Sequence, residues 1–253
     1  MLQVDGIPLV TYYDGGRGTA VCLNVPFNYY RGYPTPDSLY QYLGDDDYHG
    51  MLARVLAAIL KAHKVERPVQ VTAPGSEWLS GLDTPFHEDG KAQYVSLTKR
   101  RMAKEEAAAT VSFKTPRPGC CYDMLEGKCL GPGPEWQARI EPGGIRLFSV
   151  LPYQVQGITA KTKAASYRCG DEVKAEVRVE TKGGEPGRHV IGLRVVRPDG
   201  QEVRYLARSL EAKTGRASFA VPLALNEPAG RYTLTFTDIA TRSTALVAIE
   251  VVP

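Results

Sequence analysis

The sequence contains no long apolar run, and histidine, cysteine and tryptophan are all scarce among its 253 residues. No stretch approaches the roughly 18 consecutive apolar residues of a membrane-spanning helix, so we expect no membrane span. Residues 1–5 have neither the basic nor the apolar segment of a secretory signal. With 43% hydrophobic and 23% charged residues, the composition is that of a soluble globular protein, and it leaves the compartment open.

Motifs for common chemistries are also missing. The chain has no Gly-x-Ser-x-Gly nucleophile elbow. Gly15 to Gly18 lacks the Lys-Ser/Thr of a phosphate-binding loop and precedes a strand-like run. The acidic cluster Asp45 to Asp47 with His49 lacks the spacing of a calcium-binding loop, and we interpret it as a solvated lead-in to a helix. We therefore expect no catalytic residue, metal or cofactor in this chain.

Charge argues against a nucleic-acid partner. The 31 basic and 28 acidic residues give a net charge of only +3. The short basic run Lys99 to Arg101 lacks the extent and the interleaved aromatic residues of a nucleic-acid groove. We interpret it as solvated surface charge.

The five cysteines leave two alternatives open. They are Cys22, Cys120, Cys121, Cys129 and Cys169, an odd count that leaves at least one thiol without an intrachain partner. Either Cys120 or Cys121 could pair with Cys129 across a hairpin turned at residues 126–128. We favour three unpaired thiols there. A zinc site is less favoured, because adjacent cysteines lack the Cys-x-x-Cys spacing.

The first part of the chain, residues 1–68, is predicted to contain a hairpin and a helix. Ile7 to Tyr13 and Thr19 to Val25 are strand-like runs on either side of a Gly-rich reversal. Residues 51–63 carry apolar side chains at helical spacing, so one face of this helix must pack on something. Those apolar residues are Leu52, Val55, Leu56, Ile59 and Leu60.

The remainder is predicted to be β-rich. Residues 69–153 contain short strand-like runs between Pro/Gly clusters, which favours a small antiparallel β-domain, built as a sandwich. Residues 154–253 contain seven further runs, which favours an immunoglobulin-like β-sandwich. Two turns stand out there, Arg197 to Gly200 and Asn226 to Gly230. The fold class is therefore mainly β, preceded by one hairpin and one amphipathic helix of a partial α/β domain.

Particular motifs resemble a known family. His189 to Gly200, Pro222 to Thr233 and Asp238 to Thr241 resemble the C-terminal Ig-like domains of large bacterial proteins related to family 42 β-galactosidases, and more loosely macroglobulin-type sandwiches. Tyr13 to Asn24 resembles the closing hairpin of their amidotransferase-like trimerisation domain. Asp89 to Tyr94, with Tyr122 to Lys128, resembles the all-β domain that follows it.

The resemblance implies a carbohydrate-active parent but transfers no catalytic residue. Such enzymes resemble retaining glycosidases, whose carboxylate pair sits on a TIM barrel, and this chain has no repeating βα pattern. The barrel would lie before Met1. The leading hypothesis is a non-catalytic accessory region that packs against the preceding catalytic domain or associates with itself.

Aromatic residues suggest an alternative. Tyrosines crowd residues 29–48, and aromatic rings can stack on sugars or bury area at an interface. A carbohydrate-binding module would use Trp78, Trp136, Tyr30 and Tyr33. A third and less favoured hypothesis is a hydrolase with an acidic site at Asp45 to His49.

Overall fold

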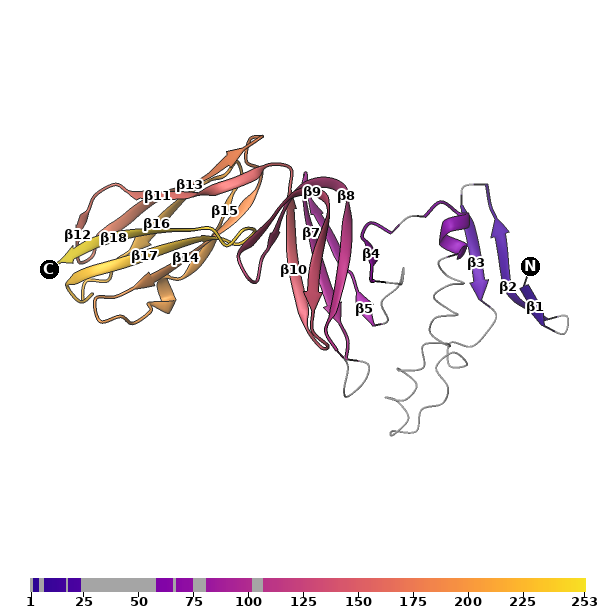
Figure 1. Cartoon of the computed structure of the whole chain (residues 1–253). Helices are drawn as coiled ribbons and strands as arrows, with labels where there is room; N and C mark the ends of the chain where they lie inside the picture. The colour runs from indigo at the N-terminus through magenta and orange to yellow at the C-terminus, as the bar shows by residue number, and fades with distance from the viewer. Residues whose placement is uncertain are drawn as a thin grey trace.

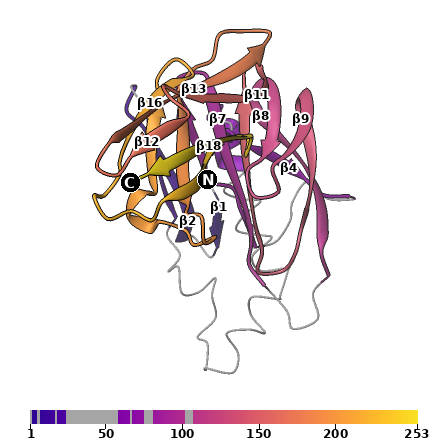
Figure 2. The same ribbon diagram turned by 90° about the vertical axis from the view of Figure 1, so that its left-hand side faces the viewer.

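The chain forms three groups of strands that follow one another in space. The computed structural model describes residues 2–4, 7–16, 18–23, 58–65, 67–74, 81–101 and 107–253. Figure 1 shows the N-terminal hairpin at one end, a central sheet, and a C-terminal sandwich at the other end. Figure 2 shows the molecule turned by 90° about the vertical axis, with the C-terminal sandwich toward the viewer. The prediction of a mainly β fold is confirmed.

The N-terminal group is the predicted hairpin with one added strand. β1 (Leu2–Val4), β2 (Ile7–Asp14) and β3 (Thr19–Leu23) form an antiparallel sheet in that order. The reversal is closed by hydrogen bonds from Gly15 N to Gly18 O, 3.0 Å, and from Gly16 N to Asp14 Oδ1, 2.9 Å. The described end of the predicted helix is helical over 58–62, and the rest of it lies outside the described residues.

The central group is one curled antiparallel sheet rather than two separate sheets. Its main strand order is β4-β8-β10-β7-β5, with β6 paired to β7 and β9 paired to β8. The curl lets Phe113 of β8 pack on Phe148 of β10 with ring centroids 4.6 Å apart. Trp136, the cross-strand partner of Phe113 on β9, packs on it at 5.7 Å. A single sheet that curls over its own apolar face can thus enclose a core without a second sheet. The strands are β4 (Gln70–Thr72), β5 (Leu82–Asp83), β6 (Phe86–Asp89), β7 (Ala92–Lys99), β8 (Ala109–Asp123), β9 (Lys128–Ile140) and β10 (Ile145–Leu151).

The long strand β8 joins two runs that the sequence suggests are separate. Pro116 and Pro118 read as breakers, yet the strand continues through them. Pairing with β9 is irregular between Lys114 and Gly119, so the prolines fall where ladder hydrogen bonds are interrupted. Proline is tolerated in a sheet at such a position because no N–H donor is needed there.

The C-terminal group consists of two sheets with a shared core. One sheet has the order β11-β13-β16 and the other β12-β18-β17-β14-β15, with β12 running parallel to β18. Buried and exposed residues alternate along β13 and β16, as expected when one face of a strand is buried. Phe219 and Phe236 meet edge to face between the sheets, with centroids 5.2 Å apart. The strands are β11 (Gln154–Thr162), β12 (Ser166–Arg168), β13 (Glu172–Lys182), β14 (His189–Val196), β15 (Arg208–Ala212), β16 (Arg216–Pro222), β17 (Gly230–Asp238) and β18 (Thr244–Val252).

One strand assignment from the sequence was wrong. Residues 202–205 read as a strand, but Glu202 makes only an isolated bridge to Val196 and Arg204–Leu206 is a 3₁₀ turn. The strand at this point is β15, a few residues later. Val203 and Leu206 are both buried, so the turn places two apolar side chains in the core without forming a strand.

Candidate functional site

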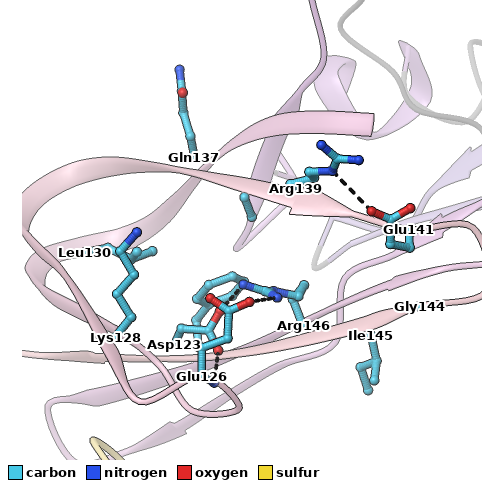
Figure 3. A pocket seen from close by; sticks show the side chains of 12 residues that line it. Asp123, Glu126, Lys128, Leu130, Gln137, Arg139, Glu141, Gly144, Ile145 and Arg146 are labelled. Atoms are coloured by element: carbon cyan, nitrogen blue, oxygen red, sulfur yellow. Dashed lines mark hydrogen bonds and ion pairs between the residues drawn. The ribbon is translucent and has the colours of Figure 1, made fainter. Parts of the chain in front are cut away.

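A hollow lies between β9 and β10 in the described part of the chain. It encloses about 450 Å³ and is lined mainly by polar and charged side chains (Figure 3). Asp123, Glu126 and Lys128 come from the hairpin tip between β8 and β9, and Arg146 comes from β10. The curl of the central sheet forms this groove.

Arg146 is held by two carboxylates in the groove. Its Nη2 lies 2.6 Å from Asp123 Oδ2 and its Nη1 lies 2.5 Å from Glu126 Oε1. The other oxygen of Asp123, Oδ1, accepts hydrogen bonds from the amides of Leu125 and Glu126, both at 2.9 Å. Asp123 therefore shapes the turn and binds the guanidinium at once.

The charge state of this cluster does not suit acid–base catalysis. Hydrogen bonding and charge from Arg146 hold the pKa of Glu126 below its ordinary value. A general acid at neutral pH needs a carboxyl whose pKa is raised. The groove thus presents two carboxylates that share one guanidinium, with Arg146 Nε buried and without a hydrogen-bond partner among the described residues.

A second polar cluster is fully buried between the central sheet and the C-terminal sandwich. His189 Nε2 lies 2.9 Å from Tyr153 Oη, and its Nδ1 lies 2.9 Å from Asp238 Oδ1. Tyr153 Oη also accepts a hydrogen bond from Gly187 N at 2.8 Å, so its own proton is available to Nε2. The imidazole then donates from Nδ1 to Asp238.

This cluster resembles a catalytic triad only in composition. The side chains of His189 and Asp238 have no exposed surface, so a substrate cannot reach them. Thr241 Oγ1 donates to the other oxygen of Asp238 at 2.6 Å, which completes the carboxylate's partners. His189 is therefore a structural hydrogen-bonding residue.

A third cluster surrounds Glu227 in the C-terminal sandwich. Its Oε2 accepts hydrogen bonds from Arg197 Nη2 at 3.1 Å and Tyr232 Oη at 2.8 Å, and its Oε1 accepts one from Tyr205 Oη. Burial acts to raise the pKa of Glu227, but the hydrogen bonds from Tyr205, Tyr232 and Arg197 outweigh it and the pKa is lowered. Both oxygens of this carboxylate are bound by protein side chains, so Glu227 stabilises the fold.

Of the four predicted carbohydrate-binding residues, only Trp136 lies in the described part of the chain. Its side chain is 5% exposed, packs on Phe113, and donates from Nε1 to Gly131 O at 3.0 Å. It lines a shallow hollow with Leu130 and Gln137, two residues that also line the groove beside Arg146. Trp78, Tyr30 and Tyr33 lie outside the described residues, as does the acidic segment Asp45 to His49.

Sequence reasoning did not find the groove or the Glu227 cluster. Glu126, Arg197 and Glu227 belong to segments that the sequence predicts as turns, and Asp123 lies shortly before the first of these turns. The residues around an acidic side chain in a turn do not show which basic side chain of another strand it will bind. That partner is determined by the order of the strands in the sheet.

Within the part of the chain that the structure describes, no group of three or more histidine, cysteine, aspartate or glutamate side chains is placed to hold a metal ion. Nor does that part of the chain contain a helix with the length and apolar character needed to span a membrane.

Comparisons with known proteins identify no family. No family model matches the chain, and no curated protein sequence matches it. Similar solved structures include the alkylpurine DNA glycosylase AlkC of Pseudomonas fluorescens, at 12% identity and a TM-score of 0.27, over 40% of this chain and 30% of that one.

Two glycoside hydrolases are similar to the same low degree. A β-glucosidase from Listeria innocua aligns at 12% identity and a TM-score of 0.28, over 39% of this chain and 16% of that one. A glycosyl hydrolase family 2 member from Bacteroides cellulosilyticus aligns at 9% identity and a TM-score of 0.27, over 63% and 27%. The chain thus spans less than a third of each of these proteins, and likeness at this level carries no functional argument.

Proposed function

We propose that this chain is a non-catalytic accessory region of a glycoside-hydrolase-like protein, acting in domain packing or oligomerisation. Its three units would be a partial amidotransferase-like hairpin and helix over 1–68, a β-domain over 69–153, and an Ig-like sandwich over 154–253. The division of the described strands into the groups β1–β3, β4–β10 and β11–β18 supports these boundaries. The family assignment itself rests on the motif resemblance.

The observation that carries the proposal is the core shared by the second and third units. Cys120, Tyr122 and Leu151 of the central sheet belong to the same buried cluster as Ile191 and Phe236 of the sandwich. Tyr122 Oη accepts a hydrogen bond from Val155 N at 2.7 Å, and Ser149 Oγ donates to Ala240 O at 2.5 Å. A continuous core suits a spacer that must hold a fixed geometry.

The ionisable clusters support a structural role for the same reason. In each of the three clusters described above a carboxylate has a partner within the cluster, which is Arg146, His189 or Arg197. None offers an accessible carboxyl pair of the kind that glycoside hydrolysis needs. The buried polar groups therefore serve the fold.

Two exposed tyrosines in the hairpin favour a packing surface. Tyr12 is 67% exposed and Tyr13 is 73% exposed. Neighbouring residues of a strand point to opposite faces, so the hairpin presents an aromatic side chain on each face. Aromatic residues are enriched in the cores of protein interfaces.

Sedimentation velocity of the purified chain tests this surface. We expect self-association that weakens at least about tenfold when Tyr12 and Tyr13 are both replaced by serine, the scale of a lost aromatic contact. The control is Leu246→Ser, at a residue 68% exposed in the sandwich. A chain that remains monomeric at every concentration reached would contradict the proposed role in oligomerisation.

Activity is tested separately with nitrophenyl glycosides. The accessory role predicts no hydrolysis by the chain alone. Turnover that disappears in Asp46→Asn would instead support the hydrolase hypothesis and overturn the proposal.

Carbohydrate binding is the second candidate. It is favoured by the hollow beside Trp136, which shares the lining residues Leu130 and Gln137 with the groove beside Arg146. Affinity electrophoresis in polysaccharide gels would detect it. Because Trp136 is buried, the informative variants are Gln137→Ala and Arg139→Ala at exposed positions of the groove, with Trp78→Ala alongside. Retardation that any of these abolishes would favour a binding module over a scaffold.

A further inference from the structure

We propose that Cys120 and Cys129 form a redox-active pair that closes the β8–β9 hairpin by a reversible intrachain disulfide. Their sulfur atoms lie 3.6 Å apart as free thiols in the described structure. A disulfide requires about 2.0 Å, so the two sulfurs must approach by roughly 1.6 Å. The proposal is independent of the accessory function.

Strand register explains why these two thiols meet. Tyr122 is opposite Cys129 and Cys120 is opposite Pro132, with an irregularity between Cys121 and Tyr122. Cys120 and Cys129 are therefore diagonal neighbours across the hairpin, a relationship that brings side chains on one face together. The hairpin turn, with Gly127 at φ 68°, sets this register.

The same geometry excludes Cys121 from the pair. Cys120 belongs to the core shared with the C-terminal sandwich, whereas Cys121 belongs to the separate core inside the curl of the central sheet. Adjacent residues of β8 point to opposite faces of the sheet. Cys129 lies on the same face of the sheet as Cys120. The alternation of side chains along β8 therefore selects Cys120 over Cys121 as the partner of Cys129.

The two thiols differ in accessibility, which suits Cys129 as the cysteine that attacks the oxidant and Cys120 as the cysteine that resolves the mixed disulfide. Cys129 is exposed and Cys120 is buried. Burial raises the pKa of the Cys120 thiol, so it is the less reactive of the two toward outside reagents. An oxidant from solution meets Cys129 first.

The chemistry is thiol–disulfide exchange with a low-molecular-weight disulfide such as oxidised glutathione. The Cys129 thiolate attacks one sulfur of the reagent, forming a mixed disulfide and releasing one glutathione thiolate. The Cys120 thiolate then attacks Sγ of Cys129, which forms the intrachain bond and releases the second glutathione thiolate. The two protein thiols are oxidised, one reagent disulfide is reduced, and the two protons end on two molecules of glutathione.

Peptide mapping by mass spectrometry tests this pairing. Trypsin cuts after Lys114, Lys128 and Arg139 but not between Arg117 and Pro118, so Cys120 and Cys129 fall in the peptides 115–128 and 129–139. After equilibration with oxidised glutathione, blocking of free thiols and non-reducing digestion, we expect these peptides linked, at least about tenfold above a dithiothreitol-treated sample.

Variants assign the link to particular sulfurs. Cys129→Ser, at an exposed position, removes it without disturbing the core. Cys121→Ala should retain the link and Cys120→Ala should lose it, while Cys22→Ser and Cys169→Ser serve as controls that leave it unchanged. Should a core variant fail to fold, fragmentation of the linked wild-type peptides distinguishes Cys120 from Cys121.

The outcomes separate clearly. A linked pair that dithiothreitol reverses supports the proposal. A glutathione adduct that persists on Cys129 without resolution, a link to Cys121 or Cys22, or only interchain links would each overturn it.

Discussion

The carboxylate of Glu227 lies 3.1 Å from Nη2 of Arg197, a residue thirty positions earlier in the chain. The contact joins two turns, Asn226 to Gly230 and Arg197 to Gly200, at one end of the C-terminal sandwich. Glu227 has no exposed side-chain surface there. A carboxylate so buried is stable only while its partners remain in place.

Replacing Glu227 by glutamine should destabilise the chain at neutral pH by about 2–4 kcal/mol, because the buried side chain that accepts hydrogen bonds from Arg197, Tyr205 and Tyr232 loses its charge. The pKa of Glu227 is lowered in the folded chain. Its stabilisation is therefore complete above the pKa of an unfolded glutamate and is lost as the pH falls through the folded value. Urea unfolding at several pH values should show the wild-type and variant curves converging in acid.

The matched control is Glu202→Gln, which breaks the exposed ion pair between Glu202 and Arg194. We expect a loss of no more than about 1 kcal/mol there. If the two variants lose the same free energy, or if the difference does not shrink in acid, the buried pair does not have the role described.

Tyr232→Phe should lower the free energy of unfolding by about 1–3 kcal/mol. The hydroxyl donates to Glu227 Oε2 at 2.8 Å and lies 3.0 Å from Pro228 O, in the manner of the tyrosine corner of β-sandwiches. Removing it takes one hydrogen bond away from the buried carboxylate of Glu227, which keeps the one from Arg197. Tyr205→Phe, at a residue 63% exposed, is the comparison and should cost less, because water can replace its hydroxyl.

Tyr153→Phe should destabilise the central sheet and the C-terminal sandwich together. The change leaves Gly187 N–H and His189 Nε2 without a partner, at an expected cost of about 1–3 kcal/mol. Trp136 fluorescence follows the central sheet, and far-UV circular dichroism follows all strands. Coincident shifts of both transitions would agree with one shared core, whereas a shift in only one signal would mean that the two units unfold independently.

Gly119→Ala should also be destabilising, by about 1–3 kcal/mol, because the new Cβ would lie 2.5 Å from Leu151 O and 2.8 Å from Val150 Cγ1. Backbone atoms of the paired strand β10 cannot move aside cheaply. The control is Gly18→Ala, where a Cβ meets no atom within 4 Å. Thermal melts in which both variants match the wild type would show that β8 and β10 can separate more easily than the packing implies.

Sequence patterns predicted most strands because the signal for a strand is local. Alternation along Val173 to Val179 and along Tyr232 to Phe236 follows from having one face of each strand buried, and both segments are strands within β13 and β17. The turn between β6 and β7 is equally local, with Asp89 paired to Ala92 and Gly90 at φ 60°. The errors fall where local signals mislead, as at the prolines of β8 and the 3₁₀ turn at Arg204–Leu206.

The functional clusters could not be predicted in the same way. Asp123 meets Arg146 across 23 residues and His189 meets Asp238 across 49, so each contact depends on which strands lie side by side. Nothing in the residues around Asp123 specifies Arg146 as its partner. Strand order and register supply that information.

By itself, therefore, the sequence determined a mainly β chain, its turns and most of its strand segments, since burial of alternate residues is a property of each segment alone. The tertiary structure decided that the central sheet curls into its own core, that this sheet shares a second core with the C-terminal sandwich, and that Cys120 rather than Cys121 faces Cys129. Those outcomes depend on how distant strands pair and which face each presents, which no single segment encodes.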